Sequence, residues 1–246
     1  MDFTALLLIL TFICGVSFIL QKLYKFNNLA SYTTELLASL FPILFIVLFI
    51  RSFIIEPFRI PSGSMIPTLL VGDFIVVNKY KYGVRVPLIN KLIYENHYPN
   101  RGDVIVFQYP ENTNVNYIKR VVGIPGDNIE YINKTLFVNG KPLLLKKINN
   151  LGPENDNLSN GIIYSENNGT KEYLILNNSN RAIDFKYNVP DDNYFVLGDN
   201  RDNSNDSRYW GTVHKNNLIG EAFMIWMYWN PKSDVRIFDR VGKNIE

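Results

Sequence analysis

Two serines stand two positions apart in the segment RIPSGSMIPTLLVGD, which covers residues 59–73. Prolines on both sides and a glycine between the serines make this segment turn-like, so Ser62 and Ser64 are candidates for chemistry rather than for packing. A serine hydroxyl becomes a strong nucleophile only when a neighbouring base removes its proton, and the usual base is histidine. The only two histidines, His97 and His214, lie far from this segment in the sequence. The base is therefore either a histidine brought close by folding or a lysine, as in Ser-Lys variants of the same chemistry.

A candidate lysine lies in the segment YIKRVVGIPGD, residues 117–127. In a strand, side chains alternate between faces, which puts Tyr117, Lys119 and Val121 on one face and Arg120 on the other. A general base must be neutral, and burial lowers the ordinary lysine pKa of about 10.4 at a cost of about 3 to 4 kcal/mol for two to three units. Arginine stays charged, so Lys119 is the candidate base. The alternative is a strand with a solvated Lys-Arg pair and a Pro-Gly turn.

A third polar segment, GDNRDNSNDSRYWG at residues 198–211, has the Asp and Asn content of a calcium-binding loop. Such a loop needs oxygen ligands at positions 1, 3 and 5, a glycine at position 6 and a glutamate at position 12. Counting from Asp199 or from Asp202 fails this test, because neither register has the glycine or the glutamate in place. We expect instead that Asp206 and Arg208 form an ion pair that stiffens the loop, and we expect no metal site.

The chain after Pro57 consists of short runs rich in Val, Ile, Phe and Tyr, separated by Gly, Pro, Asn and Asp, a pattern that is typical of strands. The clearest runs are FIVVNKY (74–80), VIVFQY (104–109), YIKRVVGI (117–124), TLFVNGKPL (135–143), YFVLGD (194–199) and IGEAFMIWMYW (219–229). Within the fourth run, Asn139-Gly140 is a hairpin turn signal, because both central residues of a type I′ turn have positive φ. The sequence therefore predicts an all-β, antiparallel domain over residues 57–246.

Residues 144–192 are more polar and rich in asparagine, with the loop-like stretches NNLGPENDNLSNG and SENNGTKEY. A disordered insertion and a small, loop-rich β subdomain both fit this composition. The apolar fragments YLIL and IDFKYNV favour the subdomain. We place this inserted subdomain at about residues 135–192.

Two apolar runs precede the β domain. Phe3 to Gln21 carries no charge, and Leu36 to Ile55 carries only Arg51, which can extend its charge toward an interface. Each run is long enough to cross about 30 Å of hydrocarbon as a helix. A cleaved signal peptide and a buried core helix are the alternatives. A signal peptide is disfavoured because its positive charges should precede the apolar run.

The order of charges also predicts an orientation. Lys22 and Lys25 follow the first run, which places the connecting loop, residues 22–35, on the cytoplasmic side. The membrane anchor, residues 1–56, would then leave the β domain outside the cytoplasm.

The single cysteine, Cys14, excludes an intrachain disulfide. A net charge of +2 without a basic tract gives no reason to expect nucleic-acid binding.

Four segments in this order, PSGSMIPTLLVGD, RGDVIVF, YIKRVVGIPGD and GDNRDNSNDSRYWG, resemble the sequence boxes of bacterial type I signal peptidases, also called leader peptidases. The resemblance covers the anchor and most of the β domain. It implies a membrane-bound serine endopeptidase without a cofactor, in which Ser64 is the nucleophile and Lys119 the general base. It also implies that the Ser62 hydroxyl joins the Ser64 backbone N–H in the oxyanion hole, and that Ser204 hydrogen-bonds and positions Lys119.

The resemblance further implies that Asp206 and Arg208 form a supporting ion pair. It implies as well that the substrates are signal peptides of exported proteins. In this family the substrate binds as an extended strand and is cleaved after small residues, often Ala-x-Ala. Gly63 would let the substrate backbone approach closely. The positions that match the walls of the substrate site are Phe58, Ile60, Met65, Leu69, Tyr117 and Ile118.

The implied location is the bacterial inner membrane, as a multi-pass protein with its catalytic domain on the periplasmic side, working with the lipid bilayer and the secretion translocon. Some members of the family carry a disulfide in the subdomain, which this chain cannot form, and residues 144–192 are shorter and more polar here. Two other hypotheses stay open: a self-cleaving repressor with the same dyad, which the membrane runs disfavour, and a tethered β domain that only binds extended peptides.

The aromatic run FMIWMYWNP, residues 223–231, has two interpretations. A core strand is the simpler one. A membrane-contacting surface is the other, because Trp and Tyr are common at the level of lipid headgroups.

Overall fold

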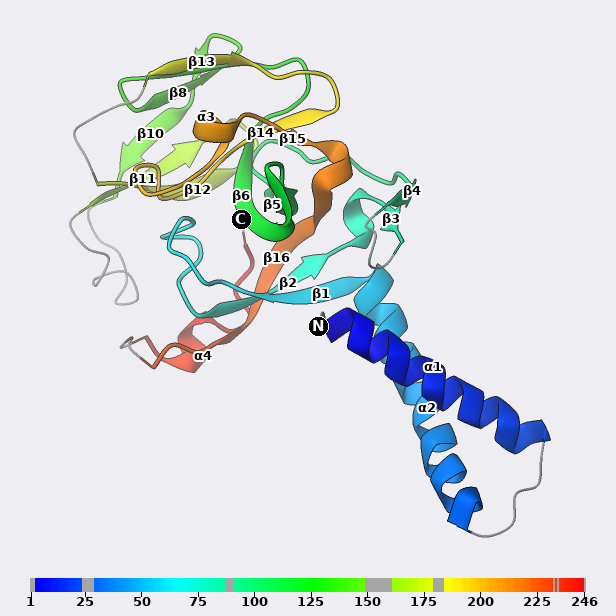
Figure 1. Cartoon of the computed structure of the whole chain (residues 1–246). Helices are drawn as coiled ribbons and strands as arrows, with labels where there is room; N and C mark the ends of the chain where they lie inside the picture. Colours follow the sequence, from blue (N-terminus) through cyan, green and yellow to red (C-terminus); the bar gives the residue numbers. More distant parts are fainter. Residues whose placement is uncertain are drawn as a thin grey trace.

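The computed structural model describes residues 3–23, 29–86, 91–148, 161–178, 184–231, 233 and 235–245. It contains a β domain from which two helices project side by side (Figure 1). The fold is mostly antiparallel β-sheet behind two N-terminal apolar helices, as the sequence predicts.

The two helices are α1 (Phe3–Leu23) and α2 (Leu29–Phe53). Both are long and apolar enough to cross a membrane. Helix α2 begins at Leu29 rather than at the expected Leu36, because its polar first turns continue the helix beyond the apolar stretch on which the expectation was based. Residues 24–28 of the expected cytoplasmic loop lie outside the described residues.

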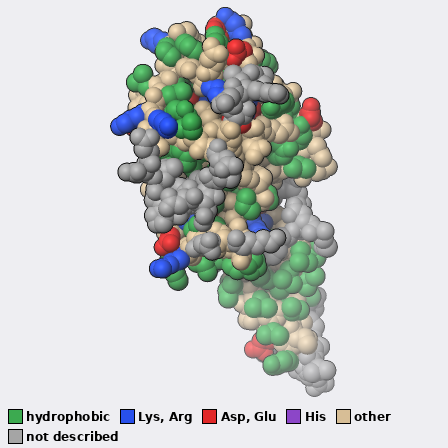
Figure 2. All heavy atoms as spheres, turned by 90° about the vertical axis from the view of Figure 1, so that its left-hand side faces the viewer, with side chains coloured by type: hydrophobic (Ala, Val, Ile, Leu, Met, Phe, Trp, Pro, Cys, Tyr) green, Lys and Arg blue, Asp and Glu red, His purple; other side chains and the backbone are tan. Residues whose placement is uncertain are grey.

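Small and polar side chains line the contact between the helices. Cys14, Thr11 and Ala38 are buried there, and the Thr11 hydroxyl donates to the Leu7 carbonyl, which satisfies it inside the helix. Only 11% of the second apolar span is buried, so α2 is not the core helix of the β domain. Figure 2 shows hydrophobic side chains crowding the projecting pair, in contrast to the mixed surface of the β domain. This exposed apolar surface is typical of membrane association.

A seven-stranded sheet, in the order β1-β2-β16-β5-β6-β14-β15, forms the main body of the β domain. Its strands are β1 (Ile55–Arg59), β2 (Asp73–Asn78), β5 (Val104–Tyr109), β6 (Asn112–Gly123), β14 (Asn193–Leu197), β15 (Val213–His214) and β16 (Leu218–Tyr228). Five of the six predicted strand segments correspond to β2, β5, β6, β14 and β16. Strand β6 begins at Asn112 because its polar first half pairs with β5, a contact that hydrophobicity alone does not reveal.

Two small sheets lie within residues 128–147, 162–177 and 185–188, and their first strand precedes residue 135. One has the order β13-β7-β8-β9 and the other β10-β11-β12. Their strands are β7 (Asn128–Ile132), β8 (Thr135–Val138), β9 (Lys141–Pro142), β10 (Leu144–Lys147), β11 (Ile162–Asn167), β12 (Glu172–Asn177) and β13 (Phe185–Asn188). The predicted hairpin turn at Asn139-Gly140 is confirmed, with φ values of 53° and 75° between β8 and β9. Most of NNLGPENDNLSNG lies outside the described residues.

The remaining elements are short. Strands β3 (Val84–Arg85) and β4 (Leu92–Tyr94) form a two-stranded sheet near the end of α2, and η1 (Tyr80–Tyr82) precedes it. Helix α3 (Ser207–Trp210), the turn η2 (Lys215–Asn217) and helix α4 (Ile237–Arg240) complete the chain. Each helix after α2 is a single turn, which agrees with the lack of helical periodicity in this part of the sequence.

Candidate active site

The predicted nucleophile and base meet in the structure. The Lys119 Nζ lies 2.7 Å from the Ser64 Oγ, within hydrogen-bond distance, although the two residues are 55 positions apart. Strand β6 carries Lys119, and the turn between β1 and β2 carries Ser64. Both residues are buried, and Lys119 is only 4% exposed. The Ile118 carbonyl, 3.0 Å away, accepts a second hydrogen bond from the Lys119 Nζ.

Burial changes the acid-base behaviour of this lysine. Desolvation lowers the pKa of Lys119 from 10.5 to about 8, against the opposing charges of Asp206 and Asp199, which favour the ammonium. At pH 7 about one molecule in ten then carries a neutral Lys119, whereas an ordinary lysine is almost never neutral there. Lys119 can therefore accept a proton from Ser64 near neutral pH.

Hydrogen bonds from Asn200 hold the turn that carries Ser64. The Asn200 backbone N–H donates to the Ser64 carbonyl at 3.1 Å, and its side-chain amide donates to the Gly63 carbonyl at 3.1 Å. No sequence pattern distinguishes Asn200 from the many other asparagines of the chain. Gly198 is equally constrained, because a Cβ there would lie 2.5 Å from the Ser64 carbonyl oxygen and 2.2 Å from the Ser204 Oγ.

A cleft of about 520 Å³ opens beside Ser64. One wall is the turn of residues 61–64, the other is residues 115–119 of β6, and Asn203 and Asn205 also line it. Ser62 is exposed at this cleft. Within the described part of the chain, the Ser64 N–H makes no hydrogen bond, so this donor is available to a bound group.

The loop of residues 198–211 approaches the cleft from the far side of β6. The expected ion pair is confirmed: the Arg208 Nε lies 2.8 Å from an Asp206 carboxylate oxygen, and Asp206 is fully buried. Asp206 also accepts the Gly198 N–H at 3.0 Å and caps α3. The expected hydrogen bond from Ser204 to Lys119 does not form in this structure. The Ser204 Oγ is buried without a partner, whereas the Lys119 Nζ donates to the Ser64 Oγ and the Ile118 carbonyl.

Comparison with known proteins shows which family this arrangement belongs to. Residues 33–229 match the family described as "Signal peptidase, peptidase S26". A signal peptidase I of Pseudomonas fluorescens is 48% identical over 240 residues, which cover 91% of this chain and 82% of that protein. The signal peptidase I of Pseudomonas aeruginosa is 47% identical with the same coverage. That of Buchnera aphidicola is 43% identical, covering 80% of this chain and 76% of that protein.

The chain belongs to the S26 signal peptidases. It is therefore a serine peptidase, and the alternative of a tethered domain that only binds peptides is wrong. The matched residues include both members of the Ser64-Lys119 pair and the whole 198–211 loop.

Two buried ion pairs lie near the Ser64-Lys119 pair, and the sequence did not reveal either. Arg120 forms two hydrogen bonds with Asp199, at 2.8 and 2.7 Å, and both side chains are fully buried. Arg201 pairs with Glu166 of β11 at 2.8 Å, and both of these are also fully buried. Arg120 does lie opposite Lys119 on β6, as alternation predicts, but both faces of the strand are covered.

Only two of the six predicted wall residues, Tyr117 and Ile118, line the cleft in this structure. Ile60, Met65 and Leu69 are 2%, 1% and 0% exposed and belong to a hydrophobic core cluster, with Phe58 and Ile118 packed against it. Leu69 in particular has no surface to offer a substrate here. These three positions lie in the core rather than at the cleft surface, a depth that a sequence match does not reveal.

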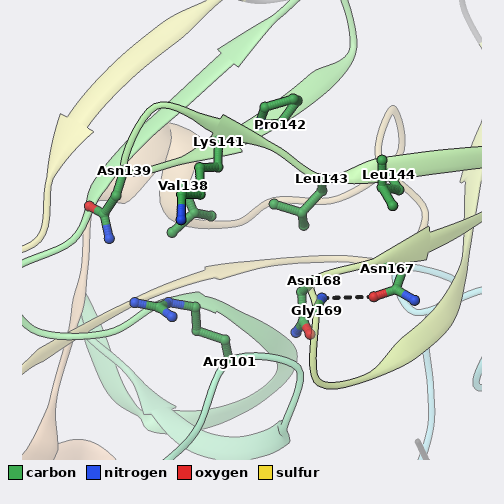
Figure 3. Close-up of a pocket in the computed structure, with 10 residues that line it drawn as sticks. All are labelled: Arg101, Val138, Asn139, Lys141, Pro142, Leu143, Leu144, Asn167, Asn168 and Gly169. Atoms are coloured by element: carbon green, nitrogen blue, oxygen red, sulfur yellow. Dashed lines mark hydrogen bonds between the residues drawn. The ribbon is translucent and has the colours of Figure 1, made fainter.

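Two other candidates for chemistry, the histidines and a second hollow, do not line the cleft beside Ser64. The His214 Nδ1 accepts the Asn216 N–H and caps η2, and neither histidine lines the cleft. A separate hollow of about 400 Å³ lies between the two small sheets, where Arg101 faces Val138 and Leu143 (Figure 3). Arg101 is bound there by Asp127 at 2.7 and 2.6 Å. None of the described residues that line this hollow is a serine, threonine or cysteine.

Proposed function

We propose that this chain removes N-terminal signal peptides from exported proteins by attack of Ser64, with Lys119 as the general base. The observation that carries the proposal is the 2.7 Å contact between the Ser64 Oγ and a lysine whose pKa burial lowers to about 8. A surface lysine at the same distance would stay protonated and would not serve as a base.

The proposed reaction has two stages. The Ser64 Oγ attacks the scissile carbonyl carbon while its proton passes to the Lys119 Nζ. The oxygen that becomes negative accepts hydrogen bonds from the Ser64 N–H and the Ser62 hydroxyl, each contributing about 3 kcal/mol. The peptide bond then breaks, and the leaving amine takes the proton from the Lys119 ammonium. In the second stage Lys119 takes a proton from water, which attacks the ester carbonyl carbon. The bond to the Ser64 Oγ then breaks, the Oγ takes the proton back from the Lys119 ammonium, and the signal peptide is released as a carboxylic acid.

The cleft supports binding of the substrate as an added strand. Strand β14 pairs with β6 only from Arg120 onward, so residues 115–119 are not covered by it. An extended peptide lying between these residues and the 61–64 turn would hydrogen-bond to backbone groups on the way to Ser64. We propose small residues of the Ala-x-Ala type before the cleaved bond. Tyr117 and Ile118 would contact them directly, while Phe58, Ile60, Met65 and Leu69 would shape the site from the core behind it.

The proposed location follows from the anchor. Helices α1 and α2 would both cross the bacterial inner membrane, with Lys22 and Lys25 on the cytoplasmic side and the β domain on the periplasmic side. Ser64 would then work close to the bilayer surface, where signal peptides leave the translocon. A cysteine introduced for Lys25 in a Cys14→Ser background should react with a membrane-impermeant maleimide only after the cells are opened. Reaction in intact spheroplasts would contradict this orientation.

The dyad is tested by cleavage of a preprotein with Ala-x-Ala before the cleavage site, using full-length chain in detergent. Ser64→Ala and Lys119→Met should each abolish cleavage, because the first removes the nucleophile and the second removes the base. Ser62→Ala should only slow it, because the Ser64 N–H still contributes. Lys146→Met, which removes an exposed lysine on β10, is the matched control and should cleave normally. Full activity of Lys119→Met would refute the dyad.

A further inference from the structure

An apolar pocket of about 600 Å³ lies where α2 meets the β domain. Its lining residues are Phe49, Phe53, Ile54, Asn78, Tyr80 and Val84. The first three come from the end of α2 and the residue that follows it, and the other three come from β2, η1 and β3. The pocket is thus formed by the helix and the β domain together, and it does not include Ser64 or Lys119.

The helical wall of the pocket is apolar and aromatic. Phe49 and Phe53 are one turn apart on the same face of α2, with ring centroids 5.3 Å apart. Phe49 is 49% exposed and Ile54 is 42% exposed. On the domain side, Tyr80 is 49% exposed. Leaving this much apolar surface in water is unfavourable by about 25 cal/mol per Å², so the pocket favours an apolar occupant.

Charged side chains beside the pocket indicate how deep it would lie in the bilayer. Arg51 lies between Phe49 and Phe53 in α2, about 3 Å along the helix axis from each at 1.5 Å per residue. Arg51 and Lys79 share one carboxylate, that of Glu56, at 3.2 and 3.1 Å. These three side chains carry a formal surplus of one positive charge. An apolar pocket beside a net positive charge fits the level of the bilayer at which the acyl chains meet the lipid phosphates.

We propose that this pocket binds one glycerophospholipid, with an acyl chain between Phe49, Phe53 and Val84 and the phosphate at the level of Arg51 and Lys79. Two observations favour a lipid. The pocket continues the exposed apolar face of a helix that is long enough to cross a membrane, and the charges beside it complement a phosphate. The bound lipid would fill the space between the helix and the β domain and so fix the angle at which the domain leaves the membrane.

Photolabelling tests the site without relying on peptidase activity. Full-length Ser64→Ala protein is placed in vesicles of phosphatidylglycerol and phosphatidylethanolamine that contain a phospholipid with a diazirine on its acyl chain. After illumination, the labelled residues are located by peptide mass spectrometry. We expect label on Tyr80 or Val84, which belong to the β domain, in addition to label on α1 and α2.

Variants separate the pocket from general contact with lipid. Val84→Trp should fill the pocket and remove the label from Tyr80 while leaving the label on α1 unchanged. If Val84→Trp does not fold, Tyr80→Gln serves instead, with loss of label from Val84 as the readout, because Tyr80 is half-exposed and its replacement should be tolerated. Tyr209→Gln, at an exposed tyrosine of α3, is the matched control. Arg51→Gln with Lys79→Gln should lower labelling of the β domain by the anionic lipid.

Two outcomes would overturn the proposal. Label confined to α1 and α2 would show that no acyl chain enters the pocket. Label on Tyr80 and Val84 that an added signal peptide displaces would assign the pocket to the apolar core of the substrate. Neither outcome bears on the Ser64-Lys119 dyad, because the protein used is inactive by design.

Discussion

Burying Lys119 lowers the stability of the folded protein while this lysine is charged. Its pKa falls from 10.5 to about 8, which corresponds to about 3 kcal/mol. Because the folded-state pKa lies below the unfolded one, the unfolded chain binds more protons between pH 8 and 10.5. Stability therefore rises with pH across this window, and the full cost is present below about pH 8.

The substitution Lys119→Met should accordingly stabilise the fold at pH 7, by at most about 3 kcal/mol, since an apolar side chain of similar length replaces a desolvated charge. The gain should shrink toward zero above pH 10.5, where the lysine is neutral in both states. Thermal unfolding of the full chain in detergent at pH 7 and at high pH measures this difference. Lys146→Met, at an exposed position, should show no such dependence. An equal change at both pH values would contradict the assigned cost of burial.

The rate of cleavage should depend on the protonation state of Lys119. For the unchanged protein, kcat/KM should rise with pH through about 8 as Lys119 loses its proton. Asp206 raises the pKa of Lys119 through its charge, so Asp206→Asn should move this rise to lower pH while lowering the maximum rate. Asp191→Asn removes an exposed carboxylate elsewhere and should leave the profile in place. A profile of Asp206→Asn that moves to higher pH would show that another group acts as the base.

Residue types and spacing singled out Ser62, Ser64 and Lys119 as candidates, but they left a histidine brought close by folding as an alternative base. The family resemblance then separated the roles of Ser62 and Ser64. It did not predict which wall residues reach the cleft, since Leu69 and Met65 are buried in the core. Asn200 was missed because a hydrogen bond to the Gly63 carbonyl leaves no signature in a chain with many asparagines.

At the scale of elements, the hairpin β11–β12 supports the 198–211 loop that packs beside Lys119. Glu166 of β11 accepts hydrogen bonds from Arg201 at 2.8 Å and from the Tyr173 hydroxyl at 2.9 Å. The Arg201 N–H donates to the Leu176 carbonyl of β12 at 2.9 Å. This hairpin lies in the polar region of the sequence. Its buried residues nevertheless form hydrogen bonds with Arg201, in the loop next to Lys119.

Breaking the ion pair between Glu166 and Arg201 should lower both the stability of the protein and its rate of catalysis. Glu166→Gln leaves Arg201 buried without its counter-charge, a loss that typically costs about 3 to 5 kcal/mol. We expect a lower Tm and a lower kcat, with the pH at which the rate rises unchanged, because Glu166 does not contribute to the pKa of Lys119. Lys186→Met breaks the exposed Lys186-Glu130 pair of the neighbouring small sheet and should change Tm little. Wild-type kcat in Glu166→Gln would show that the hairpin does not support the loop.

The apolar strands of the main sheet were predictable because their side chains form the core. The strands β10 to β13 were harder to delimit, because apolar fragments such as YLIL alternate there with polar, asparagine-rich stretches. Strand β1 was not predicted either, because the expected membrane run ends at Ile55, the first residue of this strand. Residues Ile55 to Arg59 form a strand because they pair with β2, and hydropathy does not distinguish this from the end of a helix.

For the whole molecule, the aromatic run at residues 223–231 has a buried part and an exposed part. Ile225 and Tyr228 are buried in the core, whereas Trp226 and Trp229 are 41% and 53% exposed. Phe238 of α4 is 87% exposed. Helix α4 and the point where α2 joins the sheet both lie on the lower side of the β domain in Figure 1. A bilayer crossed by α2 would therefore approach these aromatic side chains as well.

We predict that the domain rests on the membrane through Trp226, Trp229 and Phe238, because burying a side chain such as Phe238 contributes about 1.5 to 3 kcal/mol. Phospholipids with brominated acyl chains should quench the tryptophan fluorescence of the protein in vesicles. Trp226→Phe with Trp229→Phe should remove the quenched component and leave the emission of Trp210, which lies near the dyad. Phe238→Asp should slow cleavage of a membrane-inserted preprotein but not of a short soluble peptide, since only the first substrate requires the domain to lie against the bilayer. Equal loss on both substrates would mean that Phe238 supports the fold, and unquenched tryptophans would mean that α1 and α2 alone hold the enzyme at the membrane.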